Sequence, residues 1–358
     1  MNPFSYVRAG SVADAIAAAG QPGAAYLGGG TNLIDLMQGG IEQPQLLVDV
    51  TRLPGLDRIE RQPDGGTRVG ALVRNSDLAW DEGFRRAYPV VAEALRSGAS
   101  AQLRNAATTA GNLLQRTRCP YFYDTAAACN KRAPGSGCDA FGGFNRLHAI
   151  LGWSDQCIAT HPSDFCVPLA ALDAVVEIEG PDGRRDVPLT ELHRLPGNHP
   201  EQDTVLRRGE LIVAVRLPPG AAGFAGNARY VKVRDRTSYA FALVSAAAAL
   251  RLEGGRIKEA RLAFGGVAHK PWRSREAEAV LAGALPDRPA FEQAAARAME
   301  GAKGQKAKGQ GANSQESNDF KVELARRVAM RALLLAAKGT PAELPALPAS
   351  PFSGGTHV

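Results

Sequence analysis

The pattern of apolar and polar positions predicts short strands and short helices over the first two thirds of the chain. Ser11 is expected to cap a helix over 12–19, and Gly20 is expected to end it. Asp64-Gly65-Gly66 separates two apolar runs and predicts a hairpin turn. The predicted strands are 24–27, 46–50, 59–61, 67–69, 175–179, 185–189 and 210–217. This mixture is typical of a soluble α/β protein.

The last third of the chain has a different pattern. Pro218–Gly226, which holds two prolines and three glycines, is the strongest candidate for a domain boundary. The near-continuous apolar run at 240–252 predicts a long buried strand of an antiparallel sheet, with further strands at 230–234 and 260–264. Helices are predicted at 274–281, 290–299 and 320–337, a low-complexity loop at 301–311, and a Pro- and Gly-rich tail after 339.

All five cysteines of the 358-residue chain lie between residues 118 and 166: Cys119, Cys129, Cys138, Cys157 and Cys166. They could be buried small hydrophobes, a disulfide knot, or ligands. The N-terminus has no basic segment followed by an apolar run, so it does not resemble a signal peptide. A disulfide knot is therefore disfavoured, and an odd count also leaves one thiol over.

The spacing of the cysteines favours ligands, although buried structural thiols and redox-active thiols stay open. No CxxC pair occurs, which disfavours a zinc ribbon. The cysteines lie among glycines and cations, and such loops supply backbone N–H groups and positive charge to a thiolate cluster. Cys166 begins an apolar helix and is more simply a core residue. The expected ligands of an iron–sulfur cluster are Cys119, Cys129, Cys138 and Cys157.

Two further stretches have the composition of a ligand-binding site. Gly28–Asn32 follows a short strand and precedes a helix, a layout that cradles phosphate through backbone N–H groups; a plain tight turn is the alternative. Residues 103–114 are small and hydroxylated, so their backbone could lie against a flat ligand; the alternative is a simple crossover.

Composition and charge exclude some classes of function. The net charge is +6 and aromatic residues make up only 6%, so no nucleic-acid surface is expected. No apolar run reaches the 18 residues that suggest a membrane span. We also find no acid/base pair or nucleophile constellation. The expected location is cytoplasmic, or periplasmic if a signal-bearing partner exports the chain with it.

Five motifs, taken in order, resemble the FAD-binding subunit of molybdenum hydroxylases, the xanthine dehydrogenase/aldehyde oxidoreductase family. They are YLGGGTNLIDLM, RNAATTAGNLL, HPSDFCVPLAALDA, GELIVAVRLP and YVKVRDR-x-SYAFALVSAAAAL. The resemblance implies an α+β fold. Residues 1–222 would form a two-subdomain FAD-binding domain of the vanillyl-alcohol-oxidase-like (PCMH) type. Residues 227–338 would form a C-terminal α/β domain with a three-stranded antiparallel sheet and helices, followed by a tail over 339–358.

An insertion at 118–161, which holds four of the cysteines, resembles the subgroup with an extra [4Fe-4S] cluster. Its start, TRCPYFYD, looks most like the version in periplasmic aldehyde oxidoreductases. The resemblance implies a protein that relays electrons rather than one that transforms a substrate. Electrons would pass from [2Fe-2S] clusters on a small partner subunit to FAD, after substrate oxidation on a large molybdenum-cofactor subunit, within a heterotrimer or a multiple of it.

The resemblance also implies roles for individual residues. The pyrophosphate would be wrapped by Tyr26, Leu27, Gly28, Gly29, Gly30, Thr31, Asn32 and Leu33. Thr108, Gly111 and Asn112 would line the flavin and its ribityl chain, and Asp164 with Ser163 would be the ligand-contacting acid. Ile212 would pack on the adenine or dimethylbenzene side, and Lys232 would reach the flavin. The cations Arg116, Arg118, Lys131 and Arg132 would tune the cluster or stabilise reduced flavin. The alternatives are a zinc-stabilised scaffold without redox work and a standalone flavoenzyme; the substrate and the final acceptor stay open.

Overall fold

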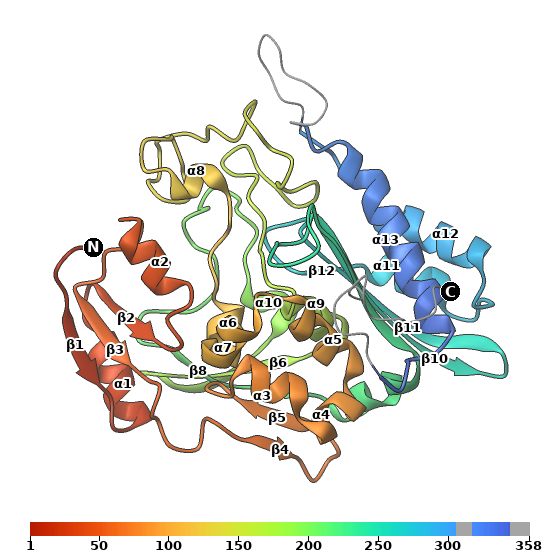
Figure 1. Ribbon diagram of the computed structural model, residues 1–358, viewed down its shortest axis with the longest axis horizontal. Helices are drawn as coiled ribbons and strands as arrows, with labels where there is room; N and C mark the ends of the chain where they lie inside the picture. The colour runs from red at the N-terminus through yellow and green to blue at the C-terminus, as the bar shows by residue number, and fades with distance from the viewer. Residues whose placement is uncertain (306–316, 344–358) are drawn as a thin grey trace.

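Three sheets organise the part of the chain that the computed structural model describes, residues 1–305 and 317–343 (Figure 1). The first sheet is parallel, in the order β1 (Ser5–Arg8), β3 (Leu46–Asp49), β2 (Ala24–Leu27). The helix α1 (Val12–Ala19) follows β1, and the Ser11 hydroxyl accepts the backbone N–H of Asp14 at 3.1 Å. This confirms the predicted cap. The strand β2 runs into the three glycines, and α2 (Leu33–Gln38) follows them.

The second sheet is antiparallel and has five strands. Their order is β4 (Ile59–Arg61), β5 (Thr67–Gly70), β8 (Leu211–Leu217), β6 (Val175–Gly180) and β7 (Gly183–Pro188). The pair β4–β5 is the predicted hairpin, and β6–β7 is a second hairpin made of the predicted strands at 175–179 and 185–189. The central strand β8 joins them, which is why its residues are almost all buried.

Seven short helices accompany this sheet, and several of them build the main hydrophobic core. They are α3 (Asn75–Trp80), α4 (Glu82–Ala87), α5 (Pro89–Ser97), α6 (Ala101–Ala106), α7 (Thr109–Leu113), α9 (Cys166–Ala171) and α10 (Leu189–Leu192). Tyr88, Phe165 and the apolar face of α5 are fully buried in this core. The small-residue stretch at 103–114, predicted as a ligand-facing run or a crossover, thus contains the end of α6 and all of α7.

The C-terminal domain pairs one sheet with three helices. After a 3-10 segment, η1 (Pro219–Asn227), come β9 (Ala228–Val233), β10 (Val244–Glu253), β11 (Arg256–Gly265) and β12 (Trp272–Arg273). The helices α11 (Arg275–Leu281), α12 (Arg288–Ala298) and α13 (Phe320–Ala337) pack with the sheet around a second core. Within the described residues, no helix is both long and apolar enough to cross a membrane.

The prediction of three strands for the C-terminal sheet is wrong, because the sheet has four strands. The sheet has the order β12-β11-β10-β9, because Trp272 and Arg273 pair with Phe264 and Ala263 of β11. A two-residue strand is too short to produce a visible alternation, so the pattern missed it. The predicted strand 240–252 also begins later, at Val244, because Ala240–Ala242 line a cavity instead.

The cysteine-bearing insertion forms a loop-rich lobe with one short helix, α8 (Pro120–Tyr123), between α2 and the N-terminal end of α13 in Figure 1. Isolated antiparallel β-bridges, which are backbone pairings and not disulfides, join Cys129 to Cys138 and Ser154 to Cys157 and fold the lobe back on itself. Most of the predicted loop at 301–311, and the tail from residue 344, lie outside the described residues.

Candidate functional site

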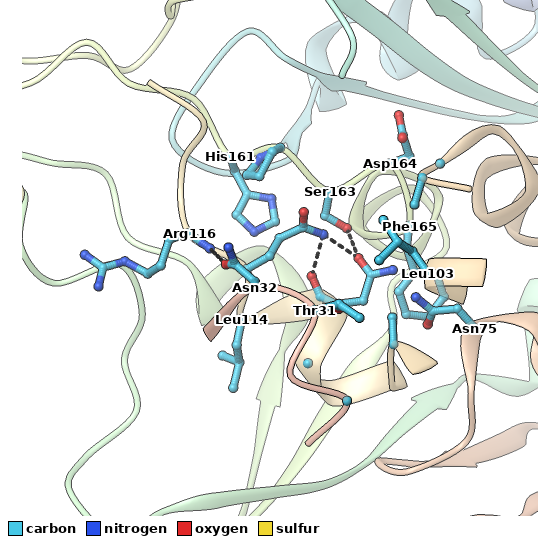
Figure 2. A pocket seen from close by; sticks show the side chains of 18 of the residues that line it. Thr31, Asn32, Asn75, Leu103, Leu114, Arg116, His161, Ser163, Asp164 and Phe165 are labelled. Carbon is cyan, nitrogen blue, oxygen red and sulfur yellow. Dashed lines mark hydrogen bonds between the residues drawn. The ribbon is translucent and has the colours of Figure 1, made fainter. Parts of the chain in front are cut away.

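A cavity of about 900 Å³ lies between the first sheet, the α6–α7 segment and the C-terminal domain (Figure 2). Its size is within the range of about 300–1,000 Å³ that is usual for small-molecule and cofactor sites. The following predicted cofactor-binding residues line it: Tyr26, Gly28, Gly29, Gly30, Thr31, Asn32, Leu33, Thr108, Gly111, Asn112, Arg118, Ser163, Asp164 and Ile212. The wall does not include Leu27 and Lys232.

The glycine loop offers a row of free backbone donors to this cavity. The N–H groups of Gly28–Asn32 donate to no other group among the residues that the structure describes. These five residues are half-buried in the cavity wall, and such a row of free N–H groups is suited to binding an anion. Gly29 lies so close to α6 that an added Cβ would be 2.1 Å from the Ala106 carbonyl oxygen. The two glycine-rich motifs of the sequence therefore form one wall.

The other side of the cavity joins residues that the insertion separates in sequence. Thr108 caps α7, and its hydroxyl accepts the Gly111 N–H at 3.2 Å. The Ser163 hydroxyl donates to Asn112 Oδ1 at 2.7 Å, and Gln115 Nε2 donates to the same oxygen at 2.7 Å (Figure 2). These bonds orient the amide and hydroxyl groups that face the cavity. The structure thus brings the predicted residues on both sides of the insertion together.

Asp164 connects the cavity to the C-terminal domain. Its Oδ1 accepts the Tyr230 hydroxyl at 2.6 Å, and its Oδ2 accepts Lys232 Nζ at 2.7 Å. Lys232 also donates to the Ser97 carbonyl at 3.2 Å, so two acceptors hold its ammonium group beside the cavity wall rather than in it. Burial, and next the charge of Asp164, raise the pKa of Tyr230 far above its usual value, so this phenol stays a donor.

Replacing Lys232 by methionine should lower the free energy of unfolding by about 3–5 kcal/mol, because the substitution leaves a buried carboxylate without its cation. Lys232 and Asp164 expose only 4% and 7% of their side chains. Chemical denaturation measures the loss. Lys258→Met is the matched control: Lys258 pairs with Glu253 with both side chains more than half exposed, and we expect a change of about 1 kcal/mol or less. Equal losses in both variants would contradict the prediction.

The sequence did not point to several other residues of the cavity wall. Asn75 is buried, and its Oδ1 has no hydrogen-bond partner within the described part of the chain, so it is an acceptor available to a ligand. Tyr239 and Phe241 are about half exposed at the rim, and the Arg118 guanidinium lies 4.8 Å from the centre of the Phe241 ring. Aromatic side chains at the mouth of a cavity are suited to a flat ring. Asn75 lies in none of the five motifs, and Tyr239 and Phe241 lie in the fifth motif but were given no role there.

The four cysteines of the insertion form a second, tighter cluster next to the cavity. Cys119, Cys129, Cys138 and Cys157 surround a small void of about 10 Å³ and pack in their own hydrophobic cluster. Burial raises the pKa of Cys119 and of Cys157 to about 12. Thiols in such a place become thiolates only when a metal offsets their charge.

Backbone amide groups lie beside two of these cysteines and favour the charged form of their thiols. The backbone amide groups of Tyr121 and Phe122 lower the pKa of the Cys119 thiol, and those of Ala140 and Phe141 lower that of Cys138, in each case against the rise that burial causes. Among the described residues, no three of these sulfurs lie within 4.8 Å of one another. Tetrahedral zinc, with Zn–S of about 2.3 Å, would bring them to about 3.8 Å.

The predicted cations have different surroundings. Lys131 is buried and bonds to the Pro200 carbonyl at 2.6 Å and to Asp203, and its charge lowers the pKa of Cys157 against burial. Arg116 pairs with Glu42 and Asp203. Arg132 holds the carbonyl groups of the α8 loop. Lys131 is therefore the predicted cation whose charge acts on a thiol, and Arg118 faces the cavity.

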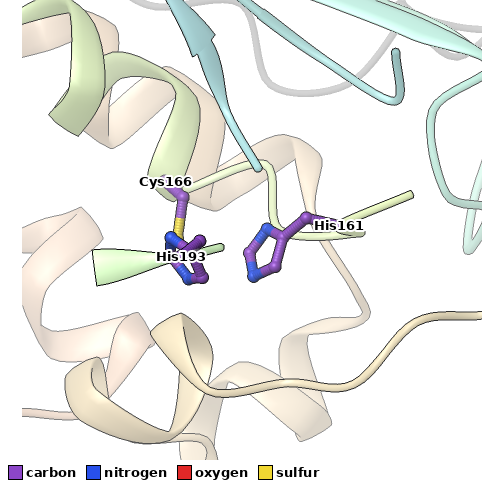
Figure 3. Close-up of side chains that lie close together, drawn as sticks. All are labelled: His161, Cys166 and His193. Carbon is purple, nitrogen blue, oxygen red and sulfur yellow. The ribbon is translucent and has the colours of Figure 1, made fainter. Parts of the chain in front are cut away.

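Cys166 lies apart from the other thiols, in the main core, as predicted. It is close to His161 and His193 (Figure 3), and burial lowers the pKa of both histidines and raises that of Cys166 to about 12. Both Nε2 atoms lie within hydrogen-bond distance of the Leu113 carbonyl, at 3.2 and 2.8 Å. This trio is thus a neutral group that packs against α7.

Two protein-family models match most of the chain. The model described as the FAD binding domain in molybdopterin dehydrogenase matches residues 2–220. The model described as the CO dehydrogenase flavoprotein C-terminal domain matches residues 229–336. The cavity lies between these two matched regions, because its wall includes residues of both.

Individual relatives are similar over nearly their whole lengths. The aldehyde oxidoreductase FAD-binding subunit PaoB of Escherichia coli (strain K12) is 56% identical over 283 residues, which cover 78% of this chain and 86% of that protein. The carbon monoxide dehydrogenase medium chain of Afipia carboxidovorans is 28% identical over 299 residues, covering 82% and 85%. The structure of carbon monoxide dehydrogenase from Hydrogenophaga pseudoflava matches with a TM-score of 0.71 and 26% identity, over 94% of this chain and 97% of that chain.

Proposed function

This chain belongs to the family of FAD-binding subunits of molybdenum hydroxylases, and on that premise we propose that it is the flavin subunit of an aldehyde oxidoreductase. The observation that carries the proposal is the cavity walled by the free N–H groups of Gly28–Asn32, in a chain 56% identical to the FAD-binding subunit of an aldehyde oxidoreductase. The comparisons favour this function over a zinc-stabilised scaffold or a standalone flavoenzyme.

The residues around the cavity fit FAD. The row of N–H groups at Gly28–Asn32 would hold the pyrophosphate, because backbone donors and glycines allow a close approach of phosphate oxygens. Thr108, Asn112 and Ser163 would bond to the polar side chain of the flavin, and the rim aromatics would cover the ring. Bound FAD supplies the ability to accept electrons singly and release them in pairs. The protein positions it and shields it from water.

We propose further that Cys119, Cys129, Cys138 and Cys157 hold a [4Fe-4S] cluster. The support is threefold: the four thiols line one small void, three of them are buried, and neighbouring backbone amides oppose the rise in pKa that burial causes at Cys119 and Cys138. Lys131 offsets part of the negative charge that four thiolates bring. Cys166 is left out because it packs in the main core.

The chain would work with two partner subunits. A large subunit would bind the molybdenum cofactor and oxidise the substrate, and a small subunit with [2Fe-2S] clusters would deliver the electrons to this chain. Medium chains are named among its relatives, which supports a place between a large and a small subunit. A heterotrimer is the simplest assembly. Either the cytoplasm or the periplasm is compatible with this proposal.

Purification of the chain together with its bound partners tests the proposal. We expect stoichiometric FAD, iron in excess of the [2Fe-2S] content, molybdenum in the complex, and aldehyde-dependent bleaching of the flavin band. The isolated chain should bind FAD but oxidise no aldehyde. Zinc without iron would favour the scaffold, and aldehyde turnover by the isolated chain would favour the standalone flavoenzyme.

A further inference from the structure

We propose that His148 and His269 are positioning residues that donate hydrogen bonds to the sulfurs of Cys119 and Cys157. We also propose that His148 together with Cys119 forms the link between the thiol cluster and the flavin cavity. This inference rests on the proposed FAD and [4Fe-4S] cofactors and assigns a role to two histidines that the family resemblance did not single out.

The first histidine lies between the two sites. His148 Nε2 is 3.1 Å from Cys119 Sγ, and both side chains are buried. Both residues line the large cavity. Cys119 also lines the small void among the four thiols, and it is the one predicted ligand that borders both spaces. A cluster held by Cys119 would therefore be separated from the flavin by this pair of side chains.

The second histidine makes the same kind of contact at a different place. His269 follows β11 in the C-terminal domain, and its Nε2 is 3.3 Å from Cys157 Sγ. Neither His269 nor Cys157 lines the large cavity. The chain thus offers a matched pair: two buried histidines beside two thiols, of which only one faces the flavin.

The C-terminal domain holds His148 in place. The His148 carbonyl accepts Lys321 Nζ at 2.8 Å and Asn318 Nδ2 at 3.1 Å. Lys321 lies in the first turn of α13 and is fully buried. On its other side the imidazole packs near the Tyr121 ring, with 6.4 Å between ring centres. These contacts fix the backbone of His148, and burial of the side chain limits the movement of the ring beside Cys119.

The chemistry follows from the state of a metal-bound sulfur. Such a sulfur has no hydrogen and can only accept, so the histidine Nε2 must carry the hydrogen and donate it. Hydrogen bonds to the sulfurs stabilise the more negative, reduced cluster and raise its reduction potential. In the transfer itself one electron leaves the reduced cluster and one enters the flavin. No atom moves, and the imidazole keeps its hydrogen.

Redox titration of the purified complex, followed by EPR and absorbance, tests the inference with His148→Leu and His269→Leu. Both variants lose one donor to a cluster sulfur, so both should keep iron and shift the cluster potential to more negative values. A more negative cluster gives its electron to the flavin more readily. In flash-reduction measurements, His269→Leu should therefore transfer the electron as fast as wild type or faster, whereas His148→Leu should be slower because the group between the sites is lost.

A third variant, His148→Gln, keeps an N–H donor near the Nε2 position and should stay closer to wild type in both readouts. If His148→Leu loses its iron, retention of iron by His148→Gln still supports the donor role, and loss in both overturns it. An unchanged cluster potential in an iron-replete His148→Leu, or equal transfer rates in the two leucine variants, overturns the inference. Wild-type protein without iron would instead overturn the proposed cluster, on which this link depends.

Discussion

Replacing Cys138 by serine should reduce the iron of this chain from about four atoms to none. Cys138 is the least buried of the four thiols of the insertion, so the substitution disturbs packing least. A serine oxygen cannot replace a soft thiolate, which is the ligand that iron–sulfur clusters select. Metal analysis and the loss of the broad iron–sulfur absorption measure the effect. The FAD content should stay near wild type, because Cys138 does not line the flavin cavity.

Cys166→Ser is the matched control. Cys166 is fully buried in the main core beside His161 and His193, away from the other four thiols. The serine variant should keep its iron and lose about 1–3 kcal/mol of stability, because a hydroxyl replaces an apolar thiol in the core. Full iron in Cys138→Ser would remove that residue from the ligand set. Loss of iron in Cys166→Ser would mean that the core thiol is a ligand after all.

The elements that the sequence predicted well are those with strong local signals. The α1 cap at Ser11, the hairpin at Asp64-Gly65-Gly66 and the long helix at 320–337 each depend on neighbours within a few residues. The alternation of apolar and polar residues predicted a strand at 210–217, and β8 begins one residue later, at Leu211. Local hydrogen bonding and periodicity were sufficient at these positions.

The elements that the sequence missed are decided by contacts from far along the chain. The strand β12 has two residues and exists because β11 offers a free edge. The strand β10 starts four residues later than its apolar run, because Ala240–Ala242 turn toward the cavity. The helices α6 and α7 have six and five residues, too few to show a helical period.

The residues of the candidate site also fall into two groups, those that a local pattern predicted and those that only long-range contacts reveal. The glycine loop and the Thr108–Asn112 stretch could be predicted because their composition is unusual. Lys232 was expected to reach the flavin; it does not line the cavity itself but bonds to Asp164, which does. His148 and His269 meet thiols 29 and 112 residues away, and no spacing in the sequence reports such contacts. Local patterns thus predict where cofactors would bind, whereas contacts between residues far apart in the sequence become visible only in the folded chain.

The Gly29→Ala substitution should weaken FAD binding by roughly ten- to hundredfold. The new Cβ would lie 2.1 Å from the Ala106 carbonyl oxygen and 2.7 Å from its carbon, so one backbone must move. Such forced shifts cost about 1–3 kcal/mol, and each 1.4 kcal/mol is about tenfold in Kd. The loop that moves is the one whose N–H groups face the cavity, so the shift weakens their hydrogen bonds to the pyrophosphate. Titration of the apoprotein with FAD, followed by flavin fluorescence, measures the change.

Two other glycines show whether the effect belongs to this contact. A Cβ on Gly28 would lie 3.1 Å from the Thr108 hydroxyl, a side chain that can give way, so Gly28→Ala should weaken binding less than Gly29→Ala. A Cβ on Gly220 would meet nothing within 4 Å, and that variant should bind FAD as wild type does. If all three variants bind FAD equally well, the glycine loop does not hold the cofactor. A loss of affinity that decreases in the order Gly29, Gly28, Gly220 would instead show that FAD binding depends on the close contact between the loop and α6. The three substitutions add the same methyl group, and they differ in how close its nearest neighbour lies.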